Sequence, residues 1–449
     1  MAARQELLPD LTIEQLRGMM SELRVNRLLV KELAPNDNSK NQPYLSGSME
    51  VTNILPSGEP YVDETKDGNR IMKAALPLEW LQPDGSSVPA PHAKLILYPQ
   101  YPEVRFSGFL KGARNAPSDL LTTRQPGRLL FFGITFDRRI IGWCAGHDSS
   151  LARALPALGD LEAVGVFRRI PLAVRAKSTR DILLEQLLRI HREDWIVSKA
   201  LRADGSLVPC RASNCIGYTL EAELGVARNG RAEPDFEGWE VKANQVGNFV
   251  RVPPSKVITL MTPEPTGGVY RDEGVEAFIR RFGYPDKRGR ADRLNFGGVH
   301  RVNERHKGTG MTLVLDGYDH DTGNVTNADG ALLLMDDAAT VAASWSFSAL
   351  LGIWSKKHAQ AVYVPGEVKK VPQREYRYGS VVRLGEGTSF NHLVGALAKG
   401  DVYYDPGIKL EDEASDNPTT KRRSQFRIKS GNMVDLYDRM EEHDLAGTK

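Results

Sequence analysis

Residues 233–243 combine side-chain types that can hold a divalent metal ion and position a water molecule. Asp235 is followed, across a short glycine-bearing link, by Glu240 and Lys242. Residues 239–243 alternate bulky apolar and charged side chains, which predicts a short strand. Successive side chains of a strand point to opposite faces, so Glu240 and Lys242 share one face. Two carboxylates beside an ammonium group suit the hydrolysis of a phosphodiester bond.

The two carboxylates predict a magnesium site. Asp235 and Glu240, with the backbone carbonyl of Val241, supply the hard oxygen ligands that Mg²⁺ prefers. The ion would stabilise charge on a phosphate and acidify a water, which Lys242 would orient or help to deprotonate. The alternative is a solvent-facing ion pair, the common role of a Glu-X-Lys triplet on a strand. Three features of the sequence favour the nuclease site over the ion pair: Asp235 before the triplet, a predicted helix upstream of Asp235, and arginine-rich segments downstream.

A helix is predicted upstream, over residues 214–225. Asn214 is a suitable N-cap, Gly225 is a suitable stop, and apolar residues recur every four positions on one face. Glu221 lies at the edge of that face and can be directed inward, where it would bind a second metal or tune the first. Glu223 lies about 200° further round the helix and is expected to face water.

The chain of 449 residues predicts two or three domains. A boundary is predicted at residues 172–178, between a β-rich unit (residues 1–175) and a second unit (residues 180–449) that interleaves helices and strands. The predicted helices cover residues 11–31, 180–197 and 341–356. The predicted strands include residues 94–98, 104–109, 128–136, 139–144, 257–261 and 311–315.

Composition predicts a cytoplasmic protein. No apolar run is long enough to span a bilayer, and the N-terminus lacks the apolar segment of a secretion signal. The three cysteines, Cys144, Cys210 and Cys215, are too few and too irregularly spaced to predict a disulfide framework or a zinc site. Because no disulfide framework is predicted, we expect the protein to occupy a reducing compartment.

Positive charge is concentrated in two segments, although the net charge is only +2. Such clusters can neutralise DNA phosphates, whereas the alternative is a set of solvated loops. The first cluster comprises Arg280, Arg281, Lys287, Arg288, Arg290, Arg293, Arg301, Arg305 and Lys307. The second comprises Lys421, Arg422, Arg423, Arg427 and Lys429.

The second unit resembles the PD-(D/E)XK nucleases of the MutH/MvaI/BcnI branch. Four motifs carry the resemblance: Leu220-Glu221, Leu224-Gly225, Pro234-Asp235-Phe236 and Glu240-Val241-Lys242. Members of this branch place a helical glutamate about fourteen residues before the aspartate, which is the spacing here. The resemblance implies an α/β fold with a mixed sheet, Mg²⁺ as cofactor and a monomer that cuts the two DNA strands in turn. Expected base-reading residues are Arg422, Arg423 and Arg427, followed by Asp405 and Lys409.

The first unit is similar, over residues 29–38, to the opening of the EcoRII N-terminal effector domain. That resemblance implies a DNA-binding pseudobarrel that grips DNA with two arms, the first at residues 31–42. Glu103 and Arg105 would lie in the second arm, where arginine can bond guanine and glutamate can accept from cytosine. The alternative is an ion pair without function. The first-arm candidates are Lys31, Asn36, Asn38, Lys40 and Gln42.

An EcoRII-type effector domain fused to an MvaI-type catalytic domain is the arrangement of a Type IIE restriction enzyme. It implies cleavage of double-stranded DNA at CCWGG or a near variant, in a prokaryotic cytoplasm, with the first unit binding a second copy of the site. One alternative is a MutH-like nickase that depends on a partner protein. The other is a DNA-binding regulator whose carboxylates form ion pairs.

Overall fold

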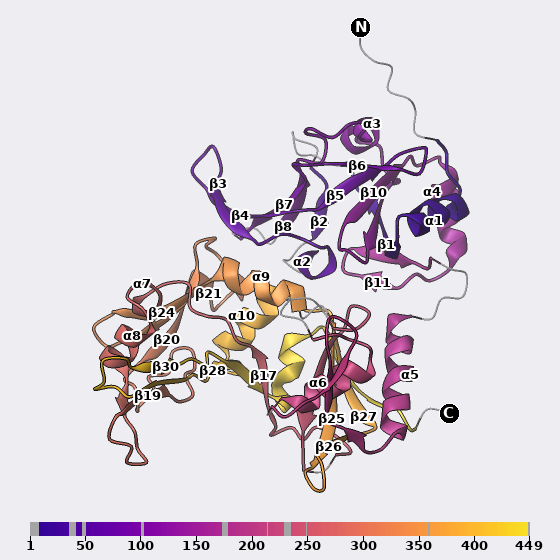
Figure 1. Ribbon diagram of the computed structural model, residues 1–449. Helices are drawn as coiled ribbons and strands as arrows, with labels where there is room; N and C mark the ends of the chain where they lie inside the picture. The colour runs from indigo at the N-terminus through magenta and orange to yellow at the C-terminus, as the bar shows by residue number, and fades with distance from the viewer. Residues whose placement is uncertain are drawn as a thin grey trace. The chain divides into compact units, whose positions relative to one another are not determined.

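The computed structural model describes residues 9–35, 42–46, 51–99, 103–172, 178–212, 214–228, 235–247, 249–357 and 360–447. The chain divides into two compact units, Met1–Lys177 and Ser178–Lys449 (Figure 1). Within the described ranges, no helix is both long enough and apolar enough to cross a membrane.

The first unit is built mainly from two sheets, which confirms that it is β-rich. The seven-stranded sheet has the order β11-β12-β1-β9-β10-β5-β6 and the five-stranded sheet has the order β2-β8-β7-β4-β3. The strands of the larger sheet are β1 (Val25–Leu33), β5 (Leu78–Leu81), β6 (Ser87–Pro89), β9 (Arg128–Thr135), β10 (Ile140–Ala145), β11 (Ala163–Val164) and β12 (Phe167–Ile170). Those of the smaller are β2 (Tyr44–Ser46), β3 (Tyr61–Glu64), β4 (Arg70–Ala75), β7 (Lys94–Tyr98) and β8 (Glu103–Ser107).

The helix predicted over residues 11–31 is wrong in its second half. The helix α1 spans only Ile13–Glu22, and Arg24 turns the chain with a positive φ of 61°. The chain then continues as β1, which pairs with β9 on one edge and β12 on the other. Pairing on both edges provides hydrogen-bond partners for the backbone of β1, and residues 28–30 are buried on both faces of the sheet. Together these contacts outweigh the local helical pattern.

The second unit contains the mixed sheet that the nuclease resemblance implies. Its order is β13-β26-β25-β27-β32, and β16 adds to β25 in the parallel direction, whereas the other pairs are antiparallel. The helices α5 (Thr179–Arg192) and α6 (Cys215–Glu223) contribute to one core with apolar side chains of this sheet. The strands are β13 (Ile196–Val197), β16 (Glu240–Gln245), β25 (Gln360–Lys369), β26 (Glu375–Tyr378), β27 (Val381–Glu386) and β32 (Arg439–Asp444).

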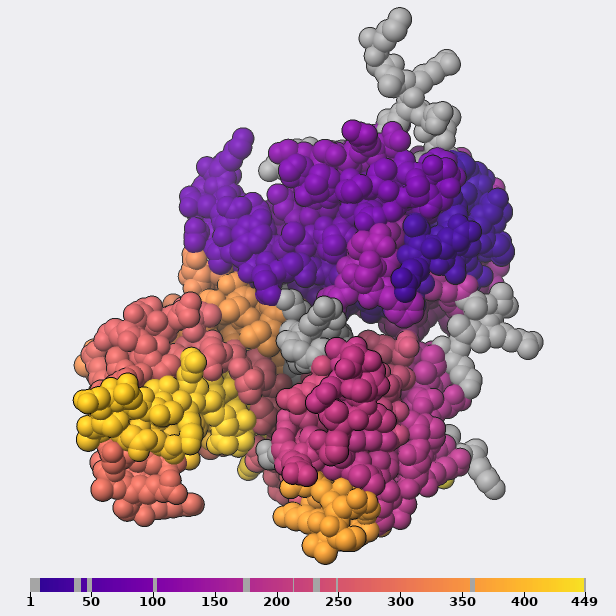
Figure 2. Space-filling model, in the orientation of Figure 1, coloured from indigo at the N-terminus to yellow at the C-terminus, as the bar shows by residue number. Residues whose placement is uncertain are grey.

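Smaller sheets complete the second unit. β17 (Val257–Met261), β31 (Phe426–Lys429) and β28 (Tyr403–Tyr404) form one, and β18 (Tyr284–Pro285), β19 (Arg293–Gly297), β29 (Gly407–Glu411) and β30 (Thr419–Lys421) form another. Figure 2 shows the late part of the chain (yellow) lying against earlier residues (salmon) at the surface. The helix predicted over residues 341–356 is also wrong in part, because β24 (Val341–Ser346) pairs with β23 (Ala331–Met335) before α9 (Phe347–Lys357) begins.

Candidate active site

A tight turn brings Asp235 back beside the start of β16. Phe236 and Trp239 exchange two backbone hydrogen bonds, of 3.0 and 2.7 Å. The two residues between them, Glu237 and Gly238, both have positive φ, which is the geometry of a two-residue hairpin turn. This pairing sets Asp235 opposite Glu240. The Asp235 carboxylate then accepts a 2.8 Å hydrogen bond from the N–H of Val241.

Glu240 and Lys242 share one face of β16, as the alternation predicted. Lys242 Nζ donates to Glu240 Oε1 at 2.9 Å. Trp239 and Val241 point to the other face and join the core beneath α5 and α6. The side chain of Glu240 is only 5% exposed and that of Lys242 is 18% exposed. The alternative of a solvent-facing ion pair is therefore excluded.

Lys242 carries a positive charge in this environment. Burial lowers the pKa of Lys242. The charge of Glu240, the nearby Tyr363, the hydrogen bond that Lys242 donates to Glu240 and the charge of Asp235 together outweigh burial and raise that pKa above the usual value of a lysine. At neutral pH the group is an ammonium that donates hydrogen bonds. It is suited to orient a water or to stabilise developing negative charge.

Two tyrosines that sequence reasoning missed lie beside this pair. Tyr363 of β25 is the register partner of Lys242 and is fully buried. Its hydroxyl lies 2.8 Å from that of Tyr437. Burial raises the pKa of both tyrosines, so both hydroxyls stay protonated. In the sequence, the apolar run around Tyr363 indicates only a buried strand. No pattern near Tyr363 indicates that Lys242 and Tyr437 lie beside it.

The helix α6 carries Glu221, whose charge acts on the buried hydroxyl of Tyr378. Its part in metal binding stays a prediction. Glu223 does not face water as expected. Its side chain is 9% exposed and forms ion pairs with Lys199 and Arg189, because neighbouring elements cover that side of the helix.

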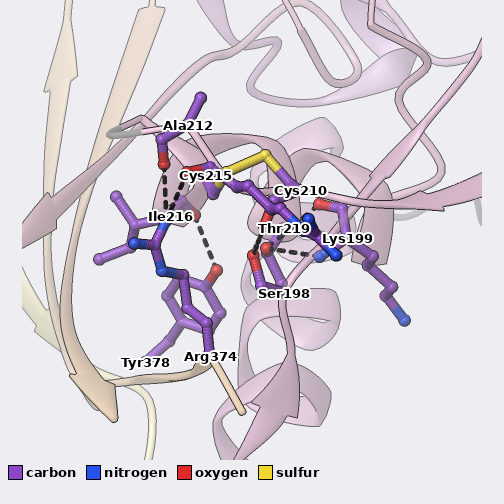
Figure 3. The surroundings of a disulfide bond; sticks show 10 residues. Ser198, Lys199, Cys210, Ala212, Cys215, Ile216, Thr219, Arg374 and Tyr378 are labelled. Atoms are coloured by element: carbon purple, nitrogen blue, oxygen red, sulfur yellow. Dashed lines mark hydrogen bonds between the residues drawn. A yellow bond between two sulfur atoms is a disulfide. The ribbon is translucent and has the colours of Figure 1, made fainter. Parts of the chain in front are cut away.

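The first residue of α6 forms a disulfide with Cys210, contrary to the expectation that the cysteines stay unpaired (Figure 3). The Cα atoms of Cys210 and Cys215 are 5.7 Å apart, and the bridge closes a short loop. Arg374 reaches this loop and donates 2.9 Å hydrogen bonds to the carbonyls of Arg211 and Ala212. Cys144 is a buried free cysteine. The pairing was missed because five residues of separation do not reveal how the chain turns, and it removes the argument from cysteine usage for a reducing compartment.

The predicted base-reading residues lie on adjacent strands or the loops that follow them. Arg427 of β31 forms a 2.6 Å ion pair with Asp405, just after β28, and both side chains remain partly exposed. The side chain of Arg423 lies over Gly407 at the start of β29. Lys409 lies on β29, and Arg422 is exposed. Contact between these five residues and DNA stays a prediction.

The first basic cluster is partly neutralised by the protein itself. Ion pairs join Arg280 to Glu413, Arg293 to Asp286 and Arg305 to Asp337. These arginines would have to exchange a carboxylate for a phosphate before they bind DNA, so the count of basic residues overstates the charge available.

In the first unit, Glu103 and Arg105 face the same side of β8 and form a two-bond ion pair. Lys31 lies on β1 with its ammonium 5.9 Å from the ring centre of Tyr44. Gln42 donates to the hydroxyl of Ser107 at 2.7 Å. The remaining first-arm candidates lie outside the described residues: Asn36, Asn38 and Lys40.

Comparison with protein-family models assigns the second unit to a known family. The model of the MvaI/BcnI restriction endonuclease family matches residues 184–437, which is more than half of the chain. The chain belongs to the MvaI/BcnI restriction endonuclease family. It is a Type II site-specific deoxyribonuclease, and the Asp235, Glu240 and Lys242 cluster lies inside the matched region.

Solved structures of MvaI are also similar to this member of the MvaI/BcnI family. The complex of MvaI with its cognate DNA is 18% identical, with a TM-score of 0.43, and the match covers 60% of this chain and 99% of that one. MvaI without DNA is 16% identical, with a TM-score of 0.34 and the same coverage. No curated protein matches the chain.

Restriction endonucleases of this family generally use a divalent metal ion. Within the described ranges, no three His, Cys, Asp or Glu side chains gather closely enough to hold a metal by themselves. The available set is two carboxylates, from Asp235 and Glu240, with the carbonyl of Val241. Mg²⁺ keeps several waters and is commonly held by one or two carboxylates, so this oxygen donor set fits it.

Proposed function

We propose that the second unit cleaves double-stranded DNA with Mg²⁺ as cofactor. Asp235, Glu240 and the carbonyl of Val241 would hold the ion, and Glu221 would support the site. The bound ion would polarise the phosphate and make a water acidic. Lys242 orients that water through its ammonium. The observation that carries the proposal is the buried convergence of Asp235, Glu240 and Lys242 at the start of β16.

We further propose a Type IIE enzyme that acts as a monomer in a prokaryotic cytoplasm, with CCWGG or a near variant as its target. Arg422, Arg423 and Arg427, with Asp405 and Lys409, would read bases. The first unit would be a DNA-binding pseudobarrel that takes a second copy of the site. Its β-rich architecture and the paired Glu103 and Arg105 support this assignment. Tethering a second site raises the effective concentration of DNA at the catalytic unit.

The test is cleavage of a sequenced plasmid with Mg²⁺, followed by mapping of the ends. Double-strand ends at one recognition sequence are expected. Lys242→Ala and Asp235→Asn should each lower the rate by roughly 10³-fold. Lys370→Ala is the matched control, because Lys370 is an exposed lysine of the same unit.

Each other outcome has a defined meaning. Unchanged rates in Lys242→Ala and Asp235→Asn would refute the assigned site. Nicks without double-strand breaks would favour a MutH-like nickase. Absence of cleavage under all metal conditions would favour a DNA-binding regulator, and ragged ends would refute a single recognition sequence.

A further inference from the structure

The sheet face that carries Lys242 also carries side chains with no role in the proposed function. Strand register sets Lys242 beside Tyr363, and Tyr363 beside Arg383 of β27. Register partners on neighbouring strands project to the same face, so these three side chains form a row across the sheet. Tyr363 is fully buried in this row, and the charges of Lys242 and Glu240 act on its hydroxyl.

Tyr437 closes the same face from outside the sheet. Its ring lies against Gly385, where an added Cβ would come within 2.8 Å of the ring. Gly385 pairs with Ala361, and Ala361 pairs with Glu240. Two small residues therefore leave the space beside Glu240 that the tyrosine ring fills. The charge of Glu240 acts on the Tyr437 hydroxyl, which lies 2.8 Å from that of Tyr363.

The backbone on either side of Tyr437 is held in place. The hydroxyl of Thr388 donates to the carbonyl of Leu436 at 2.5 Å. The N–H of Asp438 donates to the carbonyl of Gly387 at 2.6 Å. The ring of Tyr437 is therefore anchored before DNA arrives, and so is the hydroxyl pair.

We propose that Tyr363 and Tyr437 are positioning residues for Lys242 and Glu240, an inference that rests on the proposed nuclease function. A lysine side chain is long and flexible, so its ammonium occupies one place only when its surroundings restrict it. The charges of Lys242 and Glu240 act on Tyr363, and that of Glu240 acts on Tyr437, so the dipoles of the paired hydroxyls act in return on the ammonium and the carboxylate. Both tyrosines are buried, so they act through these two groups and not on DNA.

The test removes the hydroxyls alone, in Tyr363→Phe and Tyr437→Phe. Tyr376→Phe is the matched control, because Tyr376 of β26 is also buried but belongs to the core beneath α5 and α6. The single-turnover cleavage rate should fall roughly 10-fold in each test variant. DNA affinity, measured with Ca²⁺ in place of Mg²⁺, should stay within about twofold in all three proteins.

Two more variants sharpen the result. The double variant, Tyr363→Phe with Tyr437→Phe, should lose no more rate than either single variant, because the hydroxyls act as one pair. Gly385→Ala should slow cleavage similarly, since the added methyl displaces the Tyr437 ring while both hydroxyls remain. Thermal unfolding of every variant confirms that it is folded at the assay temperature.

The inference and the proposed function fail in different ways. If the wild-type protein cleaves and Lys242→Ala does not, while both Tyr→Phe variants keep the full rate, only the positioning inference is overturned. An equal loss in Tyr376→Phe, or a rate loss matched by lost DNA affinity, overturns it as well. If the wild-type protein does not cleave at all, the proposed function fails and the inference falls with it.

Discussion

Opening the Cys210–Cys215 disulfide should destabilise the second unit without unfolding it. The bridge joins residues five apart, so it closes a very short loop. Loop-closure entropy for such a loop gives about 2 kcal/mol at 25 °C, less than a long-range bridge would contribute. In the folded state Arg374 still holds the carbonyls of Arg211 and Ala212. The reduced protein should therefore keep its fold and its cleavage activity well below the melting temperature.

The assay compares thermal unfolding of the purified protein with and without a phosphine reductant. For a unit of this size, about 2 kcal/mol corresponds to a melting temperature lower by about 4 °C. Cys210→Ser should melt at the lower temperature and should not respond to the reductant, which makes it the control for other effects of the reagent. Alkylation of the oxidised, denatured protein should label one thiol, that of Cys144.

Two results would refute this reasoning. Labelling of all three cysteines in the oxidised protein would show that the bridge does not form. Equal melting temperatures of the oxidised and reduced proteins, with the bridge demonstrated by labelling, would show that closing this loop contributes nothing to stability.

Two further predictions concern pH and the first unit. Burial, with a smaller effect of His306, lowers the pKa of His300 to about 4, against about 6.5 when unfolded. Near pH 5 the imidazole of His300 therefore binds a proton in the unfolded chain but not in the folded chain. The free energy of unfolding should fall by about 2 kcal/mol between about pH 7 and pH 5. Urea unfolding at both pH values should show a smaller fall in His300→Gln, and an equal fall would contradict the assignment. Under the Type IIE proposal, a plasmid with two copies of the target should be cut faster than a plasmid with one copy. Arg105→Ala should abolish that difference in rate. Equal cleavage rates of the two plasmids by the wild-type protein would refute the two-site proposal.

Local patterns predicted the elements nearest the candidate site. Alternation predicted a strand over residues 239–243, and the structure places β16 there with Glu240 and Lys242 on one face. Helical period predicted α5, and helical period with end signals predicted α6. These predictions succeeded because strand alternation and helical period are properties of a few consecutive residues. The first of these helices was predicted to run to residue 197, but it ends at Arg192 and Ile196–Val197 form β13, because they pair with β26.

Predictions failed where distant segments compete for the same backbone. Residues 25–31 have a helical pattern, yet two strands far along the chain pair with them. Residues 341–346 likewise form a strand because β23 pairs with them. Glu223 was expected to face water because the helix was considered alone, without the lysine and arginine that pack against it.

The sequence by itself determined that an aspartate, a glutamate and a lysine occur at the spacing of a metal-dependent nuclease, and that a strand presents two of them together. Only the tertiary structure decided that a hairpin turn returns Asp235 to that strand and that the pair is buried. It also placed Tyr363 and Tyr437 beside Glu240, although Tyr437 is almost two hundred residues away in the chain. The spacing of residues along the chain shows which chemical groups are available. Burial and strand pairing depend on contacts between distant segments, and no local sequence pattern specifies those contacts.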